Sequence, residues 1–114
     1  MNQQNLTKLE IKELSKLTEL AYSRALAKAL ASLEEKFQQW RNNKITVFEL
    51  GEMIHQFHNG PARELWNFYT SGNADLVIVQ GVKDGFILKK EVSLGILEKL
   101  DGLKSVLKDI KPAL

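Results

Sequence analysis

A row of one glutamate and two histidines is the part of this 114-residue sequence best suited to bind a metal ion. Glu52, His55 and His58 are three residues apart, so on a helix each one lies beside the next. Helix bundles that hold two carboxylate-bridged metal ions place a Glu-x-x-His unit on two of their helices. Because this chain supplies one such unit, a complete site would need a second copy of the chain and further carboxylates, such as Glu49 or Glu64. The alternative interpretation is two half-exposed histidines near a helix C-terminus, where positive charge is favoured.

The segment 58–63, His-Asn-Gly-Pro-Ala-Arg, is a second candidate, for an anion. Proline suits the first position of a helix, so we expect a helix to begin at Pro61. The free N–H groups of that helix start, with His58 and Arg63 beside them, would suit a phosphate or a carboxylate. The alternative is an ordinary corner between two helices, in which Arg63 pairs with a neighbouring acid. The sequence contains no glycine-rich phosphate loop and identifies no cofactor.

Two helices around such a corner would also form a helix-turn-helix motif over residues 47–69. Its second helix, however, offers few groups suited to base edges, and Glu64 would face the phosphates. The charge is evenly mixed, with 16 Lys and Arg against 14 Asp and Glu, and eight basic and seven acidic residues in each of the ranges 1–57 and 58–114. We therefore expect no substantial binding of nucleic acid.

The composition excludes several other classes of protein. There is no cysteine, which rules out a disulfide framework, thiolate catalysis and cysteine-ligated zinc. No spacing of Ser, His and Asp suggests a nucleophilic triad. No stretch approaches the roughly 20 apolar residues of a membrane span, and the N-terminus lacks the pattern of a secretory signal. We therefore expect a cytoplasmic protein that does not interact with membranes, and we favour a protein that is not an enzyme.

The elements that must position these residues are helices. Residues 6–41 contain no Gly or Pro and are rich in strong helix formers. One face of this first helix repeats every three or four residues, and it comprises Leu26, Leu30, Leu33, Phe37 and Trp40. Asn42 and Asn43 end the helix. Its apolar side continues upstream through Leu9, Leu14 and Leu17.

The next helix should begin at a capping box, because Thr46 and Glu49 have the T-x-x-E spacing in which each side chain accepts a hydrogen bond from a backbone N–H. Ile45 and Leu50 occupy the positions of a hydrophobic staple around that cap. The buried stripe of this helix would be Val47, Leu50, Ile54 and Phe57. The aromatic residues Trp40, Phe37, Trp66, Phe68 and Tyr69 would form part of the core.

Residues 74–88 fit two structures. Their β-branched run and the Asp84-Gly85 pair are compatible with a β-hairpin. A helix that is capped by Asn73 and stopped by a left-handed Gly85 fits as well, and we favour it because the flanking segments are helical. The last segment predicts one long amphipathic helix ending near Pro112, with an inner face of Val92, Ile96, Leu100, Leu103, Leu107, Ile110 and Leu114.

These patterns predict an all-α fold of about five helices, in which long N-terminal and C-terminal amphipathic helices pack with short central ones in a single domain, residues 1–114. A straight helix over residues 6–41 would be ~54 Å long, which is longer than a compact globule of this size. We therefore expect a homodimer in which two first helices pair antiparallel, through Leu9, Leu14, Leu17, Ala21 and Ala25. The alternative is a break in the helix at residues 21–23.

For function, the leading hypothesis is a non-catalytic helical module for protein–protein interaction or regulation, which is homodimeric and open to a further protein partner. The second is a metal- or small-ligand-binding protein, with an enzyme included, that uses Glu52, His55, His58 and Arg63. The third is a nucleic-acid-binding regulator.

Overall fold

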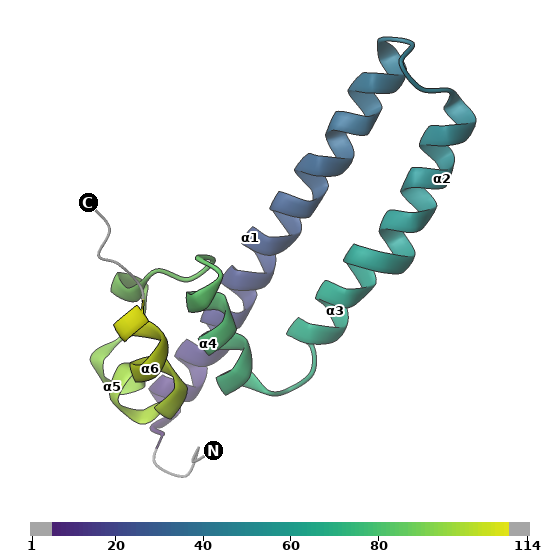
Figure 1. The fold of residues 1–114 in the computed structure, drawn as a ribbon. Coiled ribbons are helices and arrows are strands. Elements are labelled where there is room, and N and C mark those ends of the chain that lie inside the picture. Colours follow the sequence, from purple (N-terminus) through teal and green to yellow (C-terminus); the bar gives the residue numbers. More distant parts are fainter. Residues whose placement is uncertain (1–5, 110–114) are drawn as a thin grey trace. The chain divides into compact units, whose positions relative to one another are not determined.

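The computed structural model describes residues 6–109, and all its regular secondary structure there is helical (Figure 1). The elements are α1 (Lys8–Arg41), α2 (Val47–Phe57), the π-helix η2 (His58–Ala62), α3 (Arg63–Tyr69), α4 (Ala74–Lys83), the 3-10 helix η3 (Lys89–Glu91), α5 (Leu94–Lys99) and α6 (Asp101–Asp109). The prediction of an all-α fold is confirmed. Among these helices, none combines the length and the apolar character that crossing a membrane requires.

The described residues pack as two compact units that share α1. We call the first the core unit; it contains the residues up to Ala21 and those from Tyr69 onward. We call the second the hairpin; it is Tyr22–Phe68, in which the later part of α1 and the run from α2 to α3 are antiparallel (Figure 1). This division into two units describes how the residues pack. Whether residues 1–114 unfold cooperatively as the predicted single domain is a separate question, and the single domain stays a prediction.

Helix α1 is continuous from Lys8 to Arg41, so the alternative of a break at residues 21–23 is wrong. A capping box at its start escaped the sequence analysis: the Glu10 N–H donates to Thr7 Oγ1 at 3.1 Å, and the Thr7 N–H donates to Glu10 Oε1 at 2.9 Å. At its end Asn43 adopts φ 58°, a left-handed conformation that asparagine tolerates. The Lys44 N–H then reaches the Gln39 carbonyl at 2.8 Å, which closes the helix.

Helix α2 begins where predicted. Both hydrogen bonds of the capping box are present, from the Thr46 N–H to Glu49 Oε1 at 2.9 Å and from the Glu49 N–H to Thr46 Oγ1 at 3.0 Å. Leu50 is buried and Ile45 is half-buried, as the two residues of a staple would be. Of the other members of the predicted buried stripe, Phe57 is half-buried and Val47 and Ile54 are exposed, so the prediction is confirmed for Leu50 alone.

The predicted corner at residues 59–61 is also wrong. The backbone stays helical from α2 through η2 into α3, with Pro61 inside the π-helix. Proline has no N–H to donate to the carbonyl four residues earlier, and a π-helical turn is one way in which a helix accommodates that loss. The turn that a helix-turn-helix motif needs is therefore not formed.

Residues 74–83 form α4, so the helical interpretation of this segment is confirmed. Asn73 is its N-cap residue by position, although its side chain makes no capping hydrogen bond. Gly85 has φ +82° and ends the helix as predicted: the Phe86 N–H donates to the Gly81 carbonyl at 2.8 Å, and the Gly85 N–H donates to that of Val82 at 3.2 Å.

The predicted long last helix is divided into α5 and α6 at Leu100, whose backbone is extended with φ −95° and ψ 106°. The bend still places Ile96, Leu100 and Leu103 in the core. Of the predicted inner face, the side chain of Leu107 and the residues Ile110 and Leu114 lie outside the described part. So does Pro112.

Twelve of the fourteen buried hydrophobic residues in the described chain belong to the core unit. They are Leu14, Leu17 and Ala21 of α1, Tyr69, Val77, Ile78 and Val82, and Ile87, Val92, Ile96, Leu100 and Leu103. Gly81 lets the chain fold back tightly after α4, because a Cβ at this position would lie 2.8 Å from Ile87 Cδ1. Val77 and Ile78 of α4 are among the most deeply buried residues of the core unit.

Candidate interaction site

The structure places Glu52, His55 and His58 on one run of helix, as predicted, and all three are exposed. Glu52 Oε1 accepts a hydrogen bond from Gln56 Nε2 at 3.3 Å, and His55 Nε2 lies 3.1 Å from Asn59 Nδ2. Within residues 6–109, no three His, Cys, Asp or Glu side chains converge in a way that could hold a metal ion. A metal site completed by a second copy stays a prediction.

The structure changes the surroundings of the candidate anion site, which stays a prediction. Its donors were to be the free N–H groups of a helix that starts at Pro61, but η2 leads directly into α3. The Arg63 N–H, for example, donates to the Gly60 carbonyl. His58 and Arg63 are both exposed. The two side chains are therefore present on the surface, but without a helix start between them.

Four of the five residues predicted to form a dimer interface are covered by the chain itself. Leu14, Leu17, Ala21 and Ala25 are buried, while Leu9 is 80% exposed. The apolar side of the first half of α1 packs within the core unit, which sequence periodicity could not distinguish from packing on a second chain. Only Leu9 of the five is left available for a contact with another molecule.

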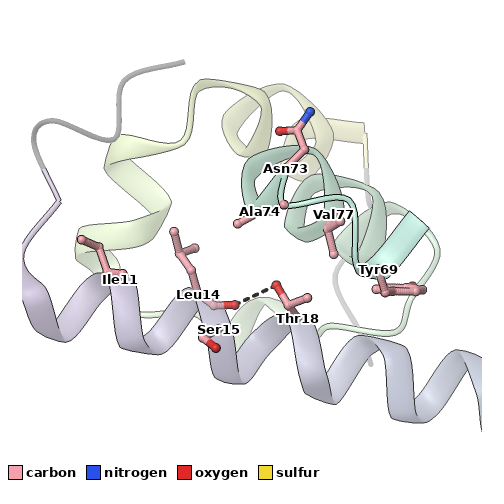
Figure 2. Close-up of a pocket in the computed structure, with 9 residues that line it drawn as sticks. Ile11, Leu14, Ser15, Thr18, Tyr69, Asn73, Ala74 and Val77 are labelled. Atoms are coloured by element: carbon pink, nitrogen blue, oxygen red, sulfur yellow. Dashed lines mark hydrogen bonds between the residues drawn. The ribbon is translucent and has the colours of Figure 1, made fainter. Parts of the chain in front are cut away.

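A cavity of about 320 Å³ lies in the core unit between α1 and the segment from Tyr69 to Val77 (Figure 2). Its walls include Ile11, Leu14 and Val77, and the Thr18 hydroxyl donates to the Leu14 carbonyl at 2.8 Å. The Asn73 amide points away from α1 in Figure 2. The volume is at the lower end of the range for small-molecule sites.

Tyr69 is the only titratable residue among those that line this cavity. Burial raises the pKa of its phenol above the ordinary value of 10.0, and the negative charge of Asp84 raises it further. The phenol therefore stays protonated at neutral pH and cannot act as a general base. The lining residues thus provide a largely apolar space with a few hydroxyl groups.

The hairpin differs from the core unit in how few of its apolar side chains are fully buried. It buries two hydrophobic residues, Ala25 and Leu50. Its exposed large hydrophobic residues are Leu30, Trp40, Val47, Phe48, Ile54 and Trp66. Trp66 is 58% exposed and Phe48 is 85% exposed. Groups of this kind mark interaction surfaces when they lie together on a soluble protein.

From their spacing in the sequence, most of these residues are predicted to lie in the core. The aromatic group of Trp40, Phe37, Trp66, Phe68 and Tyr69 does not form one cluster: Tyr69 is buried in the core unit, whereas the other four belong to the hairpin and none of them is buried. The period of three and four residues correctly identified an apolar face on each helix. It carries no information on whether the chain has enough other elements to cover that face.

Comparison with known proteins gives no relative for this chain: no family model, no curated protein and no solved structure matches it.

Proposed function

We propose that this chain is a non-catalytic helical module for protein–protein interaction, and that the hairpin is its binding element. The observation that supports this proposal is the uneven burial of the two units. The core unit has a buried apolar interior of twelve residues, whereas the hairpin leaves six large hydrophobic side chains exposed and keeps only Ala25 and Leu50 buried. Burial of apolar surface is the main driving force of protein association, so a polypeptide that covers the hairpin would be bound favourably.

The charges of the hairpin are compatible with such a role. It carries six Lys and Arg and five Glu, a net charge of +1, so it has no strong field that would select nucleic acid or a highly charged ligand. Apolar side chains rimmed by charges of both signs are typical of protein interfaces. The proposed function therefore rests on surface chemistry, and it excludes neither a homodimer nor a different protein partner.

Site-specific photo-crosslinking in cells of the source organism tests this proposal. A benzophenone amino acid in place of Trp66 should give a light-dependent adduct with a polypeptide, because it stands on the proposed binding element. The control carries the same amino acid in place of Leu94, which is 76% exposed but belongs to the core unit, and it should give none. Equal labelling from both positions, or no adduct from position 66, would disprove the proposal.

A further inference from the structure

We infer that the hairpin is covered by the hairpin of a second copy of this chain, and that the two form a four-helix bundle. This inference rests on the proposed function and names its occupant. The surface that we assign to the contact is defined by five residues, which we call the bundle face: Leu30 and Trp40 on α1, Val47 and Ile54 on α2, and Trp66 on α3.

On α1 the bundle face follows the regular apolar row of the helix. Leu30 and Trp40 belong to the row that also contains Leu26, Leu33 and Phe37, and the spacing of three and four residues keeps all five on one side. None of the five is buried: Leu30 is 47% exposed and Trp40 is 37% exposed, while the others are half-buried. The chain therefore covers this row only in part.

On α2, Val47 and Ile54 are seven residues apart, so they lie on the same side two turns apart. They are 54% and 38% exposed, whereas Leu50, between them in sequence, is buried. The helix thus has one apolar edge that packs inside the hairpin and an adjacent apolar edge that does not. A stripe of this breadth is typical of a helix that contacts two neighbours, as in a bundle of four.

The area of the bundle face suits a dimer of ordinary size. With areas of about 150–250 Å² for large side chains, the exposed fractions of these five residues amount to roughly 450 Å² of surface. A standard interface buries about 800 Å² on each partner, somewhat more than half of it apolar. Contact of two bundle faces, with the polar side chains around them, would reach that size.

A second copy is a suitable occupant by symmetry, and the charge of the hairpin does not oppose it. In a two-fold contact each copy presents the same apolar face to the other. An apolar surface on one side therefore always meets an apolar surface on the other. The near-neutral charge of the hairpin, six basic against five acidic residues, means that two copies approach without net repulsion. A pair of two-helix layers is also the usual composition of a four-helix bundle.

This contact differs from the pairing of first helices that the sequence analysis predicted. The earlier interface lies in the first half of α1, where four of the five residues are buried within the chain. The bundle face lies in the second half of α1 and in α2 and α3. Substitutions in the two regions therefore distinguish the two geometries.

Light scattering after size exclusion is the test. At about 50 μM we expect the wild-type chain at twice its monomer mass of 13.0 kDa. The double variant Leu30→Glu/Ile54→Glu should be a monomer, with the dissociation constant of the dimer raised at least ~100-fold, because each carboxylate would be buried without a partner. The matched control, Leu9→Glu/Leu94→Glu, places two carboxylates at sites 80% and 76% exposed outside the bundle face, and it should remain a dimer.

The outcomes separate this inference from the proposed function. A wild-type mass near 13 kDa overturns the four-helix bundle whether or not the variants fold, and so does dissociation of the Leu9→Glu/Leu94→Glu control. If position 66 then crosslinks to a different protein in cells, the proposed function as an interaction module is supported, and the inference that a second copy covers the hairpin is wrong. If the chain is a monomer and position 66 gives no adduct, both proposals fail. A crosslinked product of two identical chains supports both.

Discussion

Glu10 connects the first turn of α1 to α5. Its Oε1 atom accepts hydrogen bonds from Lys99 Nζ at 2.6 Å and from the Thr7 N–H at 2.9 Å. Gly95 makes room for it, because a Cβ at that position would overlap the Glu10 carboxylate. Glu13, one turn later, accepts a hydrogen bond from the Ser93 N–H at 2.8 Å. Two glutamates of α1 thus fix the start of α5, a role that neither residue shows in the sequence.

The hydrogen bond from Lys99, and then that from the Thr7 N–H, lower the pKa of Glu10 below its ordinary value of 4.5. A lowered pKa stabilises the folded state above pH 4.5, and this stabilisation is lost as the pH falls through the pKa of the folded state. We therefore expect Glu10→Gln to lower the urea midpoint at pH 7, and the difference from wild type to be smaller at pH 3. The exposed Glu19→Gln should leave the midpoint unchanged at either pH. A Glu10→Gln effect of the same size at pH 3 and pH 7 would show that the ionised carboxylate is not its source.

At the scale of the elements, the sequence predicted a helix end correctly where one particular side chain or backbone conformation is needed to form that end. The Thr46 and Glu49 capping box and the stop at Gly85 are confirmed, because each depends on residues close in sequence. The corner at Pro61 was wrong because the same proline that begins many helices is also tolerated in a π-helical turn. The division at Leu100 was missed because both halves keep the three- and four-residue period, and the bend depends on packing with α4 and within the core unit.

The end of α4 offers a test at this scale. Gly85 has φ +82° with no atom near its missing Cβ, so Gly85→Ala has room but must hold a strained backbone. We expect it to lower the free energy of unfolding by about 1–2 kcal/mol. Gly85→Asn is the matched variant, since asparagine tolerates the left-handed region, and it should lose clearly less than the alanine variant. Denaturant titration measures both, and an alanine variant as stable as wild type would show that Gly85 does not control the end of the helix.

At the scale of the whole molecule, the chain divides its apolar residues unevenly between two packed units that share one helix. The core unit buries twelve hydrophobic residues and the hairpin two. The sequence could not predict this, because the apolar faces of both units have the same helical period. Which face is covered depends on how many elements the chain brings to it, and the hairpin has only its own two helical arms.

This imbalance predicts how the two units open. Amide hydrogen exchange reports local opening, and a segment with few buried contacts opens at a lower free energy than a closed core. If a second copy binds the hairpin, raising the protein concentration from about the dissociation constant to ~100 times that value lowers the monomeric fraction from about one half to about 7%. Exchange in the hairpin should therefore slow roughly sevenfold. Exchange at residues 77–82 and 96–103 of the core unit should not change with concentration.

The variant Leu30→Glu/Ile54→Glu is the control for this experiment, and its hairpin should exchange quickly at every concentration, with the core unit as protected as in wild type. Slowing of both units together in the wild type would instead mean that they open as one body. The single domain predicted from chain length would then be confirmed, because the free energy of the contact would be transmitted through α1 to residues that do not touch it. Concentration-dependent protection confined to residues 22–68 means the reverse: α1 joins two regions that open separately, and only one of them requires a second chain.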